Sequence, residues 1–164
     1  MHPPCLLLDL SRTYHSSYHY AFFHKSQLTL NTFHSAGISA AGTTSLGIPR
    51  LREFVQGVLT EFKDDERILL WDIYNEPGQF GIGDNSIALL EMVWEWAQEI
   101  RPKQPLTACL DGSVGSEIIE CNRVNSDIIT FHTYEGEKLQ ETIDKLLTHD
   151  RPLLCTEYMP REYG

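Results

Sequence analysis

Residues 68–78 read ILLWDIYNEPG, an apolar run that ends in an amide, a carboxylate and a proline. A short, nearly continuous apolar run is typical of a strand that is buried on both faces in a parallel sheet. Pro77 cannot donate a backbone hydrogen bond to a neighbouring strand, so the strand should end at or just before it. The stretch therefore predicts a core strand whose carboxyl end carries Asn75 and Glu76.

Patterns for helices and strands alternate on both sides of this stretch. Apolar residues at helical spacing predict amphipathic helices over about 48–62, 86–101, 116–124 and 139–147. Apolar and β-branched runs predict three more strands over 105–112, 126–135 and 151–159. Strands that alternate with helices indicate right-handed β-α-β units and a parallel sheet, and thus an α/β fold.

The first 47 residues differ from the rest of the chain. They hold five of the seven histidines and show no sustained helical or strand period. Three of them, His15, His19 and His24, could be read as metal ligands, but no acidic residue lies between Asp9 and Glu53 to complete such a site. We therefore expect an N-terminal segment of unclear structure over 1–47 and one α/β domain over 48–164.

Composition excludes several classes of partner. The 164 residues include 13 basic and 23 acidic side chains, which gives a net charge of −10. Nucleic acids and anionic membranes both favour a basic surface, so neither is an expected partner. The four cysteines form no C-x-x-C pair, and we predict neither a disulfide framework nor a zinc site. No apolar stretch approaches the ~18 residues of a membrane span. The start, MHPPCLLLDL, has no basic region typical of a secretory signal. Compartment and oligomeric state stay open.

Polar side chains collect where the predicted strands end. Asn75 and Glu76 end the first strand, His132 and Tyr134 end the third, and Glu157 ends the fourth. His132 and Tyr134 are two residues apart and so lie on one face of their strand. In parallel α/β folds the carboxyl ends of the strands carry the functional side chains. Each residue alone has an ordinary structural explanation, such as helix capping or core packing, but together they predict one polar site.

Two carboxylates that face one cleft favour glycoside hydrolysis. One carboxyl group gives a proton to the leaving oxygen, and the other attacks the anomeric carbon. A gap of ~5 Å between them leads to retention through a covalent intermediate, and a wider gap leads to inversion.

Three segments of this chain resemble a known group of enzymes. LLWDIYNEPG (69–78), ITFHTYE (129–135) and RPLLCTEYM (151–159) are similar to the fourth, sixth and seventh strands of the cellulase-like (β/α)8 glycoside hydrolases. These are the retaining enzymes of clan A, and the resemblance is closest to family five. The segment LTACLDG (106–112) lies between them, where that group has its fifth strand.

The resemblance implies a role for each residue at the strand ends. It makes Glu76 the acid/base and Glu157 the nucleophile. Asn75 would contact the sugar 2-hydroxyl, Tyr134 would orient Glu157, and His132 would line the same subsite. The implied partner is a β-linked oligo- or polysaccharide, such as a cellulose-, mannan- or xylan-type chain, with no cofactor and no metal.

A complete barrel of this type needs ~250 residues, so the expected fold is a partial (β/α)8 barrel, from about the third helix through the seventh strand. The alternative to an active enzyme is a non-catalytic remnant with sugar-binding or structural capacity. A phosphate-binding loop is disfavoured, because Gly78, Gly81 and Gly83 give G-x-x-G-x-G and no Gly-Lys-Ser/Thr follows. A metal-dependent hydrolase is also disfavoured, because no second histidine stands at a strand end beside His132.

Overall fold

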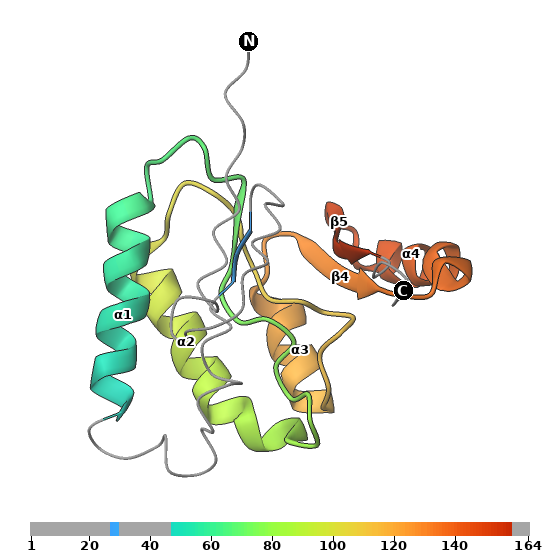
Figure 1. The fold of residues 1–164 in the computed structure, drawn as a ribbon, viewed down its shortest axis with the longest axis horizontal. Coiled ribbons are helices and arrows are strands. Elements are labelled where there is room, and N and C mark those ends of the chain that lie inside the picture. The colour runs from blue at the N-terminus through green and yellow to red at the C-terminus, as the bar shows by residue number, and fades with distance from the viewer. Residues whose placement is uncertain (1–26, 30–46, 159–164) are drawn as a thin grey trace, which may run out of the picture.

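The computed structural model describes residues 27–29 and 47–158, and Figure 1 shows how their elements are arranged. The described strands are β1 (Gln27–Thr29), β2 (Leu70–Asp72), β3 (Leu106–Thr107), β4 (Ile129–Thr133) and β5 (Leu153–Tyr158). The α-helices are α1 (Gly47–Phe62), α2 (Ile87–Ile100), α3 (Ser116–Asn125) and α4 (Leu139–Leu146). Short 3₁₀ turns, η4 (Gly83–Ser86), η5 (Gly136–Lys138) and η6 (Leu147–His149), precede or follow the helices.

All paired strands run parallel and follow one another in chain order. β1, β2 and β3 form one sheet, and β4 pairs with β5 in another. The two sheets are linked beyond β3, where Asp111 bridges Phe131 and the amide of Leu110 donates to the carbonyl of Thr130. The described strands thus form one open parallel arc, which confirms the predicted alternation of strands and helices.

The structure differs from the sequence-based expectations at two places. β1 lies within the segment 1–47, for which no strand was predicted, and it pairs with β2 from Gln27 opposite Leu70. The predicted strand 68–76 is regular only from Leu70 to Asp72, although the amide of Ile73 still donates to Thr107. The three histidines weighed as metal ligands, His15, His19 and His24, lie outside the described residues.

Helices α1, α2 and α3 pack against one face of β2 and β3. Their common core includes Trp71 and Ile73 of the first predicted strand and both tryptophans of α2, Trp94 and Trp96. These two tryptophans are 2% and 3% exposed, so they pack in the core. A second, smaller core of Leu110, Ile129, Phe131 and Leu146 joins β4 to α4.

The opposite face of the strands is polar. Thr107 and Thr130 are fully buried, and their hydroxyls hydrogen-bond at 2.9 Å between neighbouring strands. Asp72 is also fully buried at the end of β2. Because side chains alternate along a strand, Thr130 and His132 share a face, while Ile129 and Phe131 enter the apolar core on the other. The buried inner face therefore leads directly to the strand ends where the polar site was predicted.

Candidate functional site at the strand ends

Glu76 stands four residues after the last residue of β2, in an unusual backbone conformation. Its φ is +43°, in the left-handed region that non-glycine residues rarely adopt. Such strain persists only where surrounding contacts hold it, and it is frequent at functional sites. The turn is fixed by hydrogen bonds from the amide of Val114 to the carbonyl of Pro77 and from Gly83 to Gly78. The sequence predicted a polar strand end here, but it gave no sign of the positive φ.

His132 links the two predicted carboxylates. Its Nδ1 lies 2.6 Å from Oε1 of Glu76 and donates a hydrogen bond to it, and its Nε2 lies 3.5 Å from Oε1 of Glu157. The imidazole side chain is only 1% exposed, whereas the carboxylates of Glu76 and Glu157 are 23% and 35% exposed. The histidine thus forms the buried floor between two carboxylates that remain open to solvent.

Glu157 reaches this position because the β4–β5 pairing contains a bulge. Phe131 is opposite Cys155, but the next pair is His132 with Glu157, so Thr156 is the extra residue. With regular pairing His132 would oppose Thr156, and Glu157 would lie beside Thr133. A bulge changes which face of the strand a side chain occupies. Here it places Glu157 on the face that carries His132.

Tyr134 supports Glu157 from the end of β4. Its hydroxyl donates a hydrogen bond to Oε2 of Glu157, while Oε1 of the same carboxylate faces His132. Each oxygen of Glu157 therefore has its own neighbour. Partial burial, followed by the hydrogen bond and the charge of Glu157, raises the pKa of Tyr134, so its proton stays in place to be donated.

The same charges act on His132. Burial lowers the pKa of His132, but the hydrogen bond to Glu76 and the negative charge of Glu157 outweigh it, and the pKa is raised overall. The site therefore favours a protonated imidazole between two carboxylates. Beneath it the Cys109 thiol is fully buried, and burial together with the nearby carboxylates raises the pKa of that thiol. Cys109 is accordingly a neutral thiol and an unsuitable nucleophile.

Asn75 is placed beside Glu76, but the structure gives its amide no role within the site. Its Oδ1 is buried and makes no hydrogen bond to the described residues. A buried acceptor without a partner costs free energy unless something else satisfies it. The sequence-predicted residues Glu76, His132, Tyr134 and Glu157 are thus brought into one connected group, and Asn75 adjoins it.

One ligand atom each from Glu76, His132 and Glu157 lie within 4.8 Å of one another, close enough to face a single cation. The arrangement fits a hydrogen-bonded link better than a metal site. Nδ1 of His132 is already engaged with Glu76, and Nε2 faces the oxygen of Glu157. A cation bound by all three would have to break the 2.6 Å hydrogen bond or compete for the same oxygens.

Two residues next to this group were missed by the sequence reasoning, Gly112 and Cys109. Gly112 has a φ of +141°, and the space where its side chain would be is bordered by Glu76, His132 and Cys109. The only sequence signal was that the strand 105–112 ended in glycine rather than in a reactive side chain.

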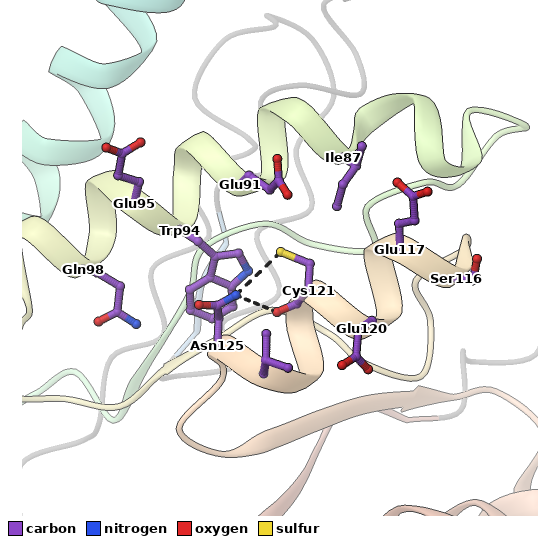
Figure 2. Close-up of a pocket in the computed structure, with 11 residues that line it drawn as sticks. Ile87, Glu91, Trp94, Glu95, Gln98, Ser116, Glu117, Glu120, Cys121 and Asn125 are labelled. Carbon is purple, nitrogen blue, oxygen red and sulfur yellow. Dashed lines mark hydrogen bonds between the residues drawn. The ribbon is translucent and has the colours of Figure 1, made fainter.

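A pocket of about 690 Å³ lies away from this group, between α2 and α3 (Figure 2). Its lining includes four glutamates and no lysine, arginine or histidine: Glu91, Glu95, Glu117 and Glu120. Figure 2 also shows Asn125 hydrogen-bonded to the carbonyl and the thiol of Cys121. None of the residues at the strand ends lines this pocket, so it is a separate feature of the helical layer.

None of the helices in the described part of the chain is long and apolar enough to span a membrane.

Comparison with known proteins finds similar folds only among solved structures. No protein-family model and no curated protein matches the chain. Among solved structures, a β-glucuronidase from Faecalibacterium prausnitzii is similar over 67% of this chain and 20% of its own, with a TM-score of 0.51 and 18% identity. A β-glucuronidase from Bifidobacterium dentium, complexed with coumarin-3-O-glucuronide, is similar over 70% of this chain and 21% of its own, with a TM-score of 0.53 and 22% identity.

The chain thus spans about a fifth of the length of the solved structures that it matches. Identities this low speak for the fold alone. They agree with the open parallel arc of the described strands and with the predicted architecture. The described strands and helices therefore form part of a (β/α)8 barrel whose sheet is not closed.

Proposed function

We propose that this chain carries the catalytic carboxylates of a retaining glycoside hydrolase that acts on β-linked glycans. One observation supports this more than any other. Carboxylate oxygens of Glu76 and Glu157 lie within 4.8 Å of one another at the carboxyl ends of two strands of a partial barrel. A separation of about 5 Å suits direct attack by one carboxylate on the sugar. An inverting enzyme needs a wider gap, because a water molecule must fit between the carboxylate and the sugar.

In this proposal Glu157 is the nucleophile. Its two oxygens face different neighbours, the hydroxyl of Tyr134 and Nε2 of His132. The hydrogen bond from Tyr134 fixes the orientation of the carboxylate, so that its other oxygen can be aimed at the anomeric carbon. Attack forms a covalent glycosyl ester on Glu157 and breaks the bond to the leaving oxygen.

Glu76 is the acid/base in the same scheme. It protonates the leaving oxygen in the first step and removes a proton from water in the second, as that water attacks the glycosyl ester. The hydrogen bond from Nδ1 of His132 holds the Glu76 side chain in place at the end of its strand. Asn75 would offer its side-chain amide to the sugar 2-hydroxyl, and that hydroxyl would give the buried Oδ1 the partner it lacks among the described residues.

The similar solved structures are β-glucuronidases, whereas the sequence motifs resemble the cellulase-like enzymes of family five. Both point to a β-linked sugar, and the choice of sugar is a matter for experiment. We therefore propose a screen of aryl β-glucoside, mannoside, xyloside, galactoside and glucuronide substrates, each with the same activated leaving group.

A mechanism-based inactivator tests the nucleophile. A 2-deoxy-2-fluoro β-glycoside of the preferred sugar should label the chain once, with the label on Glu157 in a peptide map. The matched variant Glu157→Gln should stay unlabelled. A label on another residue, or no aglycone release by a folded wild-type chain from any substrate of the screen, would rule the proposal out.

The acid/base assignment has its own test. Replacement of Glu76 by Ala should lower kcat about 10²- to 10⁴-fold on substrates with poor leaving groups. It should spare the first step on a 2,4-dinitrophenyl glycoside, because that leaving group needs no proton. Added azide should then restore turnover and give a β-glycosyl azide. An α-azide product would contradict retention.

A non-catalytic remnant is the second candidate, and the observation that favours it is that the described strands form an open arc and not a closed barrel. It predicts a cooperative thermal transition with no hydrolysis in the screen. It also predicts that Glu157→Gln leaves any sugar binding unchanged.

A further inference from the structure

Gly112 lies at the end of the segment 105–112, which contains β3. It is directly next to the hydrogen bond that joins Glu76 and His132. A Cβ atom built at this position would lie 3.2 Å from Oε1 of Glu76 and 3.2 Å from Nδ1 of His132. These are the same two atoms that make the 2.6 Å hydrogen bond. The missing side chain of Gly112 therefore leaves room for that contact.

Cys109 also limits the space for a side chain at position 112. The same Cβ would lie 2.7 Å from Sγ of Cys109, which is closer than a carbon and a sulfur atom can approach without movement. Cys109 is fully buried, and its thiol donates to the carbonyl of Asp111. The thiol of Cys109 therefore has little freedom to rotate away. A side chain at position 112 would instead push against Glu76 and His132.

The backbone of Gly112 is held in place from the β2 side. Nε2 of Gln79 donates a 2.6 Å hydrogen bond to the carbonyl of Gly112, and the amide of Val114 donates to Pro77 at 3.0 Å. Because these bonds tie the segment to the turn that follows Glu76, the backbone cannot easily shift to accommodate a side chain. The backbone φ of +141° at Gly112 is a further obstacle to a side chain, since residues other than glycine rarely adopt this angle.

We propose that Gly112 is a positioning residue that sets the geometry of the Glu76–His132 hydrogen bond and, through it, the placement of the acid/base carboxylate. The effect on the hydrogen bond follows from the contacts at Gly112. The effect on hydrolysis rests on the proposed function. The two parts are separable by experiment, because one is read from the imidazole of His132 and the other from turnover.

The direct test is Gly112→Ala in the full chain, read by NMR of the imidazole nitrogens of His132 after labelling of the histidines. The signals of His132 are assigned with the variant His132→Asn. In wild type the Nδ1 proton should appear far downfield, because it is donated to a carboxylate at 2.6 Å. In Gly112→Ala this proton should move upfield or exchange faster.

A second variant keeps the test valid if Gly112→Ala folds poorly. Replacing Cys109 by Ala removes the sulfur atom at 2.7 Å but leaves both 3.2 Å contacts in place. The pair Cys109→Ala and Cys109→Ala/Gly112→Ala therefore isolates the effect on Glu76 and His132. Gly57→Ala is the matched glycine control, because a Cβ there meets no atom within 4 Å.

On a substrate whose aglycone needs protonation, we expect Gly112→Ala to lower kcat about tenfold to a hundredfold, with KM changed less than about twofold. The 2,4-dinitrophenyl glycoside should be much less affected in its first step. Gly57→Ala should match wild type in both measurements. This split between leaving groups distinguishes a displaced acid/base from a general loss of stability.

Unchanged His132 signals in a folded Gly112→Ala chain, or in the double variant against Cys109→Ala, would overturn the inference. Equal loss of kcat on both kinds of substrate would also overturn it, since the acid/base would then not be the group displaced. If wild type hydrolyses nothing in the screen, the proposed function fails. The His132 signals still decide in that case whether Gly112 sets the hydrogen bond.

Discussion

At the scale of single residues, the site is defined by a histidine between two carboxylates. His132 is nearly inaccessible to solvent, yet each of its nitrogens faces a carboxylate oxygen that solvent can reach. A buried imidazolium would be unfavourable alone, and the two negative charges compensate it. In return the imidazole restrains Glu76 through the 2.6 Å hydrogen bond from Nδ1.

The raised pKa of His132 predicts how stability depends on pH. Since the pKa of His132 in the folded state lies above the ordinary histidine value of 6.5, the folded state binds this proton more tightly than the unfolded chain does. The resulting stabilisation is fully present below about pH 6.5 and is lost as pH rises through the folded-state pKa. Urea unfolding of wild type and His132→Asn between about pH 6 and pH 9 should therefore show a free-energy difference that shrinks as pH rises.

The variant His149→Asn is the control, because His149 lies in η6, outside the connected group at the strand ends. It also removes one imidazole, so a change with pH that is seen only for His132→Asn belongs to the group at the strand ends. A difference for His132→Asn that stays flat or grows with pH would contradict the protonated state inferred for His132.

The strand-end rule identified Glu76, His132, Tyr134 and Glu157 from the sequence, and the structure brings these four together. The rule works because parallel strands end at one edge of the sheet, so position along each strand is sufficient. It could not reveal Gly112, since glycine contributes no group to a site. That role depends on distances of a few ångströms between three different segments.

At the scale of elements, helices and their order were predictable, while strand register was not. The helical periods of α1 and α2 are long and regular, and the structure has these helices within one or two residues of the predicted bounds. The bulge at Thr156 leaves no mark in the apolar pattern of RPLLCTEYM, because apolar residues occupy both faces of that strand. Register in such a strand is set by contacts rather than by alternation.

Asn122 joins three elements and should matter strongly for stability. It is fully buried in α3, where its Oδ1 accepts from Nε1 of Trp94 in α2 and its Nδ2 donates to the carbonyl of Cys109. Replacement by Leu leaves the indole N–H and the carbonyl without these partners. The indole N–H is then left unsatisfied, at about 1–3 kcal/mol, and the carbonyl keeps the Ser113 hydroxyl but loses one hydrogen bond, at about 1 kcal/mol. We therefore expect a loss of about 2–4 kcal/mol in the free energy of unfolding, measured with urea.

The matched control for Asn122→Leu is Asn125→Leu, one turn further along the same helix. Asn125 is only partly buried, and its side chain donates to Cys121, which is its own helical neighbour. We expect a loss below about 1 kcal/mol, because water can replace that hydrogen bond. Equal losses in the two variants would mean that the buried network is not what stabilises α3.

At the scale of the whole molecule, the parallel α/β architecture was predictable from the alternation of patterns alone. The partial barrel followed from chain length, since 164 residues are too few for eight units. β1 was not predictable, because QLT is three residues long and is stabilised by its parallel pairing with β2 rather than by its own sequence. Short edge strands of this kind are defined by their neighbours.

The net charge of −10 predicts a dependence of stability on salt. Self-repulsion destabilises a compact acidic chain, and raising NaCl from about 0.01 M to about 0.15 M shortens the Debye length from about 30 Å to about 8 Å. Exposed ion pairs such as Arg52–Glu99 weaken at the same time, but each contributes little. The thermal midpoint should therefore rise with salt.

The control for the salt dependence replaces two glutamates of the pocket in Figure 2. Glu91 and Glu95 lie one turn apart on α2 and line the pocket together. The variant Glu91→Gln/Glu95→Gln removes two negative charges and should show a smaller rise over the same salt range. A thermal midpoint that falls with salt in wild type would show that ion pairs outweigh repulsion.

The extra residue in β5 makes this site unusually sensitive to the length of the chain. A substitution at Thr156 changes one side chain, whereas deletion of that residue would restore regular pairing and turn Glu157 toward the opposite face of the sheet. The shortened chain would keep Glu157 in its sequence, but that carboxylate would no longer face His132. The loss of one codon in this strand would therefore remove the site in one step, whereas a substitution at Thr156 would leave the pairing of Glu157 with His132 in place.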